Sequence, residues 1–207
     1  ANTVSKVVES IARSPRMPVL VGEVCYEGIL GASWENVQRL MFWTGILNGT
    51  AGHTYGANGI WQINTKTKPF GPSPHGQSWG DTPWEEAYQL SGSEQVSLGK
   101  RLLKRYPWWR FEPHLEWVEP HWSKENYFQP YAAGIPKEVR IVYIPATGRL
   151  PKVKEIEKGI TYCAFYFDPR NGKEYDIGTV VPDEKGEWQL PKPPIIQDWI
   201  LVMEAKG

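Results

Sequence analysis

The junction between an apolar run and a carboxylate constrains the fold more than any other stretch of this chain. Residues 18–21 read Pro-Val-Leu-Val and are followed by Gly22 and Glu23. An apolar run of this length, bounded by Pro and Gly, is typical of a strand buried on both faces, as in a parallel sheet. A strand over 18–23 would place Glu23 at its carboxyl end, where the loops of parallel α/β folds converge on a ligand crevice. Glu23 is therefore the first candidate for a catalytic carboxylate.

The first 110 residues alternate between helical and extended patterns. Apolar spacing predicts helices over 3–14, over 34–47, and from a capping box that begins at Ser91 to about residue 106. A second short strand is expected over 50–56. This alternation is typical of parallel βα units. Because two parallel strands cannot bury both faces or satisfy their outer edges, we expect further strands from elsewhere to complete the sheet.

The pattern changes after about residue 136, where short extended segments follow one another with turn signals between them. Strands are predicted over 139–144, 160–167, 175–181, 188–190 and 199–203. Their spacing indicates a small antiparallel β-sandwich. The segment 107–136 is rich in Trp, Pro and His, and we expect it to be irregular. The chain therefore divides into an α/β part over 1–118, a connector over 119–136 and an all-β part over 137–207.

Charge and cysteine content exclude some partners and leave the compartment open. The formal net charge is zero, so there is no electrostatic footprint for nucleic acid or an anionic membrane. The apolar runs are too short to span a bilayer, and no secretory signal is visible. An extracellular or periplasmic location is somewhat favoured, and a cytoplasmic one is compatible. Cys25 and Cys163 could form a disulfide, but without a disulfide framework two buried free thiols are favoured.

Aromatic residues are unusually abundant, with 11 Trp and 10 Tyr. Aromatic side chains commonly fill cores. Many of those in this chain lie in Gly- and Pro-rich segments, which favours pocket-lining positions, and aromatic planes stack well on sugar rings. Trp61 follows a Gly-rich loop and is the best candidate for such a platform, whereas Trp43 lies in a predicted helix and is expected in the core.

Several motifs together resemble apiosidase-like glycoside hydrolases, which are (β/α)8 barrels. The resemblance rests on GEVCYEG over 22–28, Phe42-Trp43 in the next helix, and AGHTYGANGIWQ over 51–62. These segments resemble the last two βα units of that family. The tail resembles the small β-domain that often follows the barrel and is sometimes described as collagen-binding; the segments that carry this likeness are 142–145, 167–172 and 198–202. The implied fold is an incomplete (β/α)8 barrel followed by a small antiparallel β-sandwich.

The resemblance implies a retaining glycoside hydrolase that acts on a plant or microbial poly- or oligosaccharide. Glu23 would be the nucleophile at the end of barrel strand seven. Substrate-binding residues implied beside it are Tyr26, Glu27, His53, Tyr55, Asn58 and Trp61. A general acid/base expected at the end of strand four has no counterpart in this chain. We therefore expect a second polypeptide that carries the N-terminal barrel strands and this carboxylate, or else a homo-oligomer.

Other interpretations of the same residues stay open. Glu27 could be the second catalytic carboxylate, a supporting group, or one half of an ion pair with Arg39. His53 could donate to a sugar hydroxyl or to Glu23, or be a core histidine. Glu23 itself could be a buried structural carboxylate, and the whole chain could be a non-catalytic carbohydrate- or protein-binding module.

No metal or cofactor is expected. The remaining histidines, His75, His114 and His121, are too scattered in sequence to suggest a metal site. The Gly-rich loop over 56–59 lacks phosphate-binding spacing, so it does not indicate a nucleotide.

Overall fold

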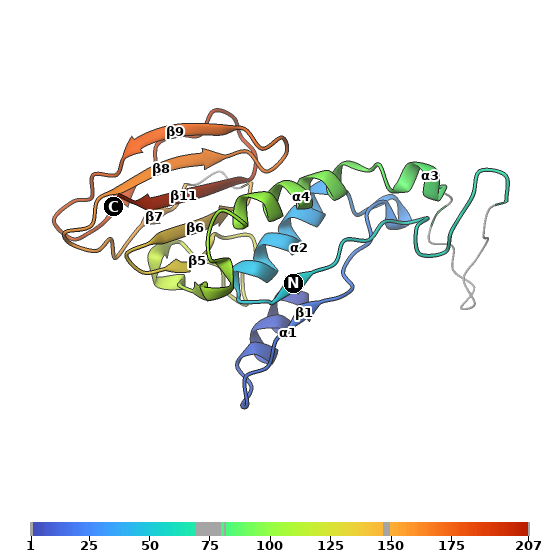
Figure 1. Cartoon of the computed structure of the whole chain (residues 1–207), viewed down its shortest axis with the longest axis horizontal. Helices are drawn as coiled ribbons and strands as arrows, with labels where there is room; N and C mark the ends of the chain where they lie inside the picture. The colour runs from blue at the N-terminus through green and yellow to red at the C-terminus, as the bar shows by residue number, and fades with distance from the viewer. Residues whose placement is uncertain (1, 69–79, 81, 147–149, 207) are drawn as a thin grey trace.

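A computed structural model describes residues 2–68, 80, 82–146 and 150–206 (Figure 1). The helices in these ranges are α1 (Asn2–Ile11), α2 (Glu35–Leu47), α3 (Trp84–Ala87) and α4 (Ser91–Leu103), with 3-10 turns at Ile29–Gly31, Trp108–Arg110 and Leu115–Trp117. The strands are β1 (Leu20–Val21), β2 (Gly52–His53), β3 (Glu112–Pro113), β4 (Val118–Glu119), β5 (Tyr131–Ile135), β6 (Val139–Ile144), β7 (Lys152–Val153), β8 (Tyr162–Phe167), β9 (Glu174–Thr179), β10 (Trp188–Gln189) and β11 (Trp199–Ala205). Among the described residues, no helix is long and apolar enough to cross a membrane.

The predicted parallel pairing of the two N-terminal strands is confirmed, although each strand is only two residues long. Leu20 lies opposite Gly52 and Val21 opposite His53, with α2 as the crossover between β1 and β2. Val21 is buried against α2, where a Cβ on Gly45 would lie 3.4 Å from its Cγ2 atom. Leu20 points the other way and is 62% exposed. One face of this small sheet is therefore packed on α2, and the other is open.

The C-terminal half forms two antiparallel sheets, as the strand pattern predicted. The larger sheet has the order β3-β5-β6-β11-β8-β9, and the smaller has the order β10-β7-β4. One face of the larger sheet packs on α2 and α4, and the other packs on the smaller sheet and its loops. Both faces of β11 are consequently buried, and residues 199–203 are all apolar. An apolar run of this kind needs cover on both sides of the strand.

The segment over 107–136 is not irregular as predicted, because it contributes β3, β4 and β5. β5 lies in the larger sheet between β3 and β6. Its sequence, Tyr-Ala-Ala-Gly-Ile, does not predict a strand, because small residues stand where strands usually have β-branched ones. The larger sheet also packs on the helices directly, since Trp43 of α2 stacks over Tyr143 of β6 at 6.5 Å between ring centroids.

The capping box predicted at Ser91 is wrong. Ser91 is already helical, and the residue before it, Leu90, makes no side-chain hydrogen bond to the helix end. The amide of Gly92 instead donates to Glu27, at 3.1 Å from Oε1 and 3.0 Å from Oε2. A carboxylate distant in sequence thus satisfies an amide of the first turn and also suits the positive end of the helix dipole.

Candidate functional site

Glu23 follows β1 on the loop that leaves the carboxyl end of the strand, and its side chain is exposed. The alternative that Glu23 is a buried structural carboxylate is therefore wrong. The hydroxyl of Tyr26 donates a hydrogen bond to Glu23 Oε1 at 2.5 Å. Burial raises the pKa of Tyr26 to about 12, with further contributions from this hydrogen bond and from the charge of Glu23. The phenol is thus a protonated donor at neutral pH and holds one carboxylate oxygen in place.

A cavity of about 250 Å³ lies beside this pair. Its lining residues are Glu23, Val24, Cys25, Tyr26, Ile29, Asn58, Trp61 and Gln62. The wall is largely apolar with a few polar groups and one carboxylate, which is the usual composition of a small-molecule site. Trp61 is 60% exposed, so its ring is accessible for stacking. Four of the residues expected at the site, Glu23, Tyr26, Asn58 and Trp61, therefore line one cavity.

Asn58 and Gln62 brace the wall of this cavity. Gln62 Nε2 donates to Asn58 Oδ1 at 3.2 Å, and the amide of Gly59 donates to Gln62 Oε1 at 3.2 Å. Both side chains are buried. These two hydrogen bonds join the Gly-rich loop to the turn that follows it.

Glu27 lies behind the cavity wall and does not line it. Its backbone continues the parallel pairing of β1 and β2, because it accepts from Asn58 N at 2.8 Å and donates to Gly56 O at 3.0 Å. Its carboxylate is buried, accepts from the Tyr55 hydroxyl at 2.5 Å, and also accepts from the first turn of α4. Burial raises the pKa of Glu27, against the lowering effect of the hydrogen bonds from Tyr55 and Gly92.

These contacts correct two expectations. Glu27 and Tyr55 bind each other, and a direct contact with substrate is not available to the buried Glu27 carboxylate. The alternative in which Glu27 forms an ion pair with Arg39 is wrong, because Arg39 pairs with Asp198 at 2.7 Å. Glu27 fits the supporting role, in which it joins the strand ends to α4.

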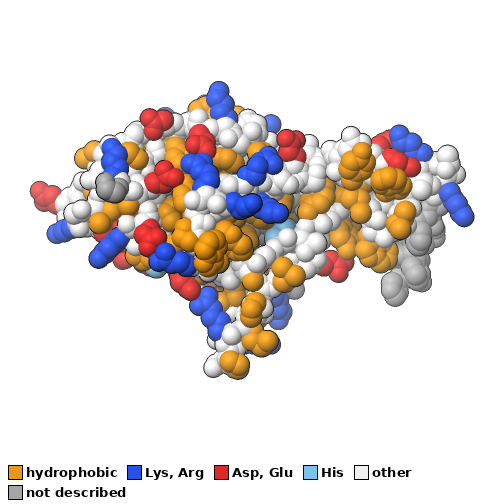
Figure 2. Space-filling view, in the orientation of Figure 1, with side chains coloured by type: hydrophobic (Ala, Val, Ile, Leu, Met, Phe, Trp, Pro, Cys, Tyr) orange, Lys and Arg blue, Asp and Glu red, His pale blue; other side chains and the backbone are white. Residues whose placement is uncertain are grey.

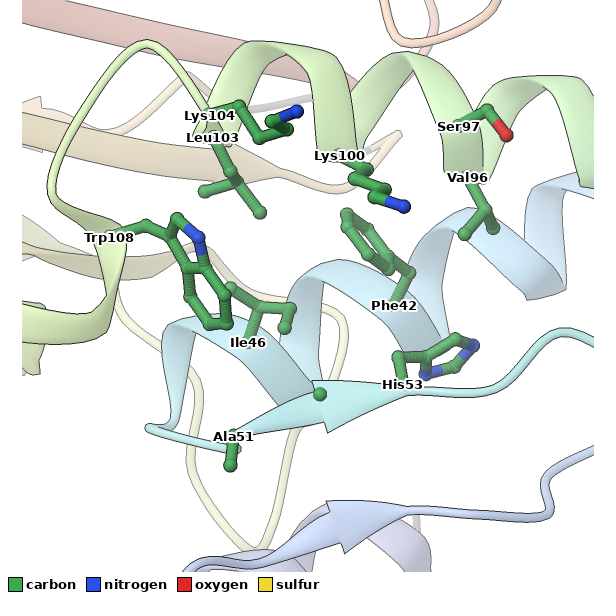
Figure 3. Close-up of a pocket in the computed structure, with 11 residues that line it drawn as sticks. Phe42, Ile46, Ala51, His53, Val96, Ser97, Lys100, Leu103, Lys104 and Trp108 are labelled. Carbon is green, nitrogen blue, oxygen red and sulfur yellow. The ribbon is translucent and has the colours of Figure 1, made fainter.

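His53 does not face the Glu23 cavity, so its expected contact with Glu23 is wrong. It lies opposite Val21 on the face of β2 that packs on the helices, edge-on to Phe42 with the ring centroids 5.6 Å apart. Figure 3 shows it pointing into a second pocket, between α2 and α4. Burial lowers the pKa of its imidazole to about 4, so His53 is neutral at pH 7.

Sequence reasoning missed four residues that line the Glu23 cavity: Val24, Cys25, Ile29 and Gln62. Cys25 is exposed, which corrects the expectation of two buried thiols, and both cysteines are free as predicted. The position of Cys25 two residues after Glu23 was the available signal. Among the described residues, no group of three His, Cys, Asp or Glu side chains could hold a metal ion. His75 lies outside the described residues.

Comparison with known proteins places this arrangement in a family. A model of the apiosidase-like catalytic domain matches residues 1–110. No curated protein matches the chain. One similar solved structure, described as a glycoside hydrolase, has a TM-score of 0.79 at 23% identity, over 97% of this chain and 45% of its own. A glycoside hydrolase family 5 protein from Bacteroides vulgatus ATCC 8482 has a TM-score of 0.76 at 20% identity, over 97% and 44%.

This chain thus spans less than half the length of both structures. At this level of identity, the likeness shows a shared fold. The family model covers 110 of the 207 residues, including both parallel strands and every residue of the Glu23 cavity. The chain therefore belongs to the apiosidase-like catalytic-domain family.

Proposed function

We propose that this chain is part of a retaining glycoside hydrolase that cleaves a plant or microbial poly- or oligosaccharide, with Glu23 as the nucleophile. The observation that carries the proposal is the exposed Glu23 carboxylate, held by the Tyr26 hydroxyl at 2.5 Å beside an aromatic-lined cavity. The family and the fold both support it, since the similar structures are described as glycoside hydrolases.

The proposed chemistry begins with attack by Glu23 on the anomeric carbon. A carboxylic acid on the other side of the bond protonates the leaving oxygen, and a covalent glycosyl-enzyme forms. The same group then acts as a base, activating a water molecule that releases the sugar. Tyr26 binds Oε1 of Glu23 and leaves Oε2 for attack. Trp61 offers an exposed ring on which the sugar can stack.

The acid/base group must come from outside the described cavity wall, because Glu23 is its only carboxylate among the described residues. Glu27 is occupied by Tyr55 and Gly92. In retaining enzymes the two carboxyl groups lie about 5–5.5 Å apart. We therefore propose that a second polypeptide supplies this group together with the remaining strands of a (β/α)8 barrel, with a homo-oligomer as the other arrangement. The likeness of residues 137–207 to collagen-binding-type β-domains stays a prediction.

The test is hydrolysis of aryl glycosides by the completed assembly, with Glu23→Gln as the variant and Glu94→Gln, at an exposed position of α4, as its matched control. We expect Glu23→Gln to lose hydrolysis while sugar binding persists, and Glu94→Gln to keep both. Hydrolysis retained by Glu23→Gln would refute its role as nucleophile. Hydrolysis by the isolated 207 residues would remove the need for a partner.

The second candidate function is a non-catalytic carbohydrate- or protein-binding module. The observation in its favour is the cavity itself, which joins an exposed Trp61 to a single carboxylate. Sugar binding without hydrolysis in the completed assembly would support this function, whereas turnover that depends on Glu23 would exclude it.

A further inference from the structure

Another cavity lies where the start of α2 meets the larger sheet, and it shares no described lining residue with the two pockets above. Its volume is about 440 Å³, which is within the usual range of small-molecule sites. Side chains from four parts of the chain line it: Glu35 and Asn36 in the first turn of α2, Phe128 before β5, Arg170 in the turn after β8, and Gln197 before β11. We call this space the junction cavity.

Buried polar groups form the inner wall of the junction cavity. Arg39 and Asp198 line it as an ion pair, with 2.7 Å between Nε and Oδ2. The Tyr143 hydroxyl donates to the same carboxylate at 3.3 Å. Because these groups are already paired with one another, they offer a ligand a preorganised polar surface.

The outer wall has polar groups that the protein itself does not occupy. In the described part of the chain, the side chains of Glu35 and Asn36 have no hydrogen-bond partner. Arg170 is exposed, and its Nη1 donates to Gln197 Oε1 at 3.0 Å. Gln197 Nε2 is buried, and it has no acceptor among the residues that the structure describes. Buried polar atoms nearly always have partners, so this donor indicates a missing acceptor.

Phe128 gives the same cavity an exposed aromatic ring. The residue is 62% exposed, and its amide donates to Asn126 Oδ1 at 3.0 Å, which holds the backbone at this position. Leu40 and Pro145 extend the apolar surface. A pyranose has an apolar C–H face that packs against an aromatic ring, and hydroxyls at its edge that donate and accept hydrogen bonds. An exposed ring beside carboxylate, amide and guanidinium groups matches both requirements.

The charges of the junction cavity balance, which favours a neutral ligand. Among its described lining residues, the carboxylates of Glu35 and Asp198 are matched by the guanidinium groups of Arg39 and Arg170. An anion or a cation would therefore meet a like charge as well as an opposite one. The wider surface is also mixed, since Figure 2 shows acidic and basic side chains interspersed over the C-terminal half of the chain.

We propose that the junction cavity binds a neutral sugar unit of an oligo- or polysaccharide, stacked on Phe128 and hydrogen-bonded through its hydroxyls to polar groups of the outer wall. Glu35 accepts from these hydroxyls, and Asn36 and Arg170 donate to them. A sugar oxygen also supplies the acceptor that Gln197 Nε2 lacks. This binding uses groups of this chain alone, so it requires neither Glu23 nor a completed barrel.

The junction cavity lies at the end of α2 that is next to the Glu23 cavity. A Cβ on Gly28 would lie 3.8 Å from the ring of Trp34, which precedes α2, and 3.9 Å from Cβ of Asn58, which lines the Glu23 cavity. A polysaccharide bound at the junction cavity would consequently be held near Glu23, where its effective concentration would rise. This consequence, unlike the binding itself, rests on the proposed function.

The test is a titration of the ¹⁵N-labelled 207-residue chain with cellotetraose, xylotetraose, mannotetraose and maltotetraose, monitored by NMR. We expect at least one of these neutral sugars to shift the backbone amides of Asn36 and Phe128 and the side-chain amide of Gln197, which is identified by its absence in Gln197→Met. Three results would overturn the proposal: shifts confined to the Glu23 cavity, binding of the acidic tetragalacturonate alone, or no shift at these residues with any of the four sugars.

Matched aromatic variants assign the binding to this cavity. Phe128→Ala should weaken sugar binding at the junction cavity about tenfold, because it removes the stacking anchor. Trp61→Ala removes a ring of similar exposure, 60%, from the Glu23 cavity and should leave that affinity within about twofold. Circular dichroism verifies folding, and Arg170→Ala, at an exposed turn position, decides the outcome if Phe128→Ala does not fold. An unchanged affinity in the folded variant would refute binding at this cavity.

Hydrolysis by the assembly proposed above separates this inference from the proposed function. Phe128→Ala should raise KM for a polysaccharide that binds the junction cavity and leave aryl-glycoside hydrolysis unchanged. Sugar binding at the junction cavity without any hydrolysis would refute the proposed function and leave this site in place. Hydrolysis without shifts at Asn36, Phe128 and Gln197 would refute the site and leave the function in place.

Discussion

Asp198→Ala should destabilise the fold far more than the loss of an ordinary surface ion pair. Arg39 of α2 and Asp198, which immediately precedes β11, expose only 6% and 7% of their side chains. Arg39 Nε donates to Oδ2 at 2.7 Å and Nη2 donates to Oδ1 at 2.8 Å. The other ends of the pair are also occupied, because Arg39 Nη1 donates to Gln95 at 2.5 Å and the Tyr143 hydroxyl donates to Asp198 at 3.3 Å. Removing the carboxylate leaves a guanidinium buried without its counter-charge.

The magnitude follows from the two charge-assisted hydrogen bonds that are lost. At about 1.5–3 kcal/mol each, they amount to roughly 3–6 kcal/mol. Breaking a buried ion pair by removing one partner costs about 3–5 kcal/mol in other proteins. The double variant Arg39→Met, Asp198→Leu should cost less than Asp198→Ala alone, because the uncompensated charge disappears.

The control is the ion pair between Arg110 and Glu138, which has the same two-point geometry on the surface. Its N–O distances are 2.9 and 3.2 Å, and its side chains are 53% and 48% exposed. Glu138→Ala should cost less than about 1 kcal/mol. Urea denaturation with linear extrapolation gives each free energy of unfolding. The reasoning is refuted if Asp198→Ala loses no more stability than Glu138→Ala, or if the double variant is the least stable.

Three further predictions concern the two pockets. Tyr26→Phe removes the hydrogen bond that orients the Glu23 carboxylate. Because a misplaced reacting group costs up to about a hundredfold in rate, kcat for hydrolysis by the assembly proposed above should fall roughly ten- to hundredfold; an unchanged kcat would contradict this. His53 has a pKa of about 4 when folded against 6.5 unfolded, so the folded state binds fewer protons and stability should fall, by at most about 3 kcal/mol, as pH drops from 6.5 to 4. His53→Phe should abolish that slope in urea titrations at each pH. Exposed Cys25 should react with a disulfide reagent before half-buried Cys163, and Cys25→Ser should remove the fast phase.

The helices and strands that could be predicted are those that follow from patterns of neighbouring residues in the sequence. The spacing of apolar residues predicted α1, α2 and α4, and the apolar run before Glu23 predicted the parallel strand. β5 was missed because its packing needs small residues. A Cβ on Gly134 would lie 2.1 Å from the carbonyl oxygen of Val139, so the close approach of β5 to β6 excludes the side chains that usually mark a strand.

The candidate site was predicted only in part, because some of its residues carry a local sequence signal and others depend on distant contacts. Glu23 and Trp61 could be found because a strand end and a Gly-rich loop are visible in sequence. The side of β2 on which His53 lies depends on the register between β1 and β2, and a shift of one residue would reverse it. The place of Glu27 depends on the amide of Gly92, which is 65 residues away. A pattern of neighbouring residues around Glu27 cannot indicate a hydrogen-bond partner this far along the chain.

The larger sheet has a consequence for how this protein can be divided or recombined. One of its faces packs against α2 and α4, so the C-terminal strands bury the apolar sides of the helices that lie behind the Glu23 cavity. A shortened chain that ended at residue 118 would lack this sheet and would expose the apolar sides of both helices to water. An exchange of segments between relatives that separated the helices from the sheet would break one continuous core. Residues of both halves therefore depend on the same core, and neither half can keep its apolar surface buried without the other.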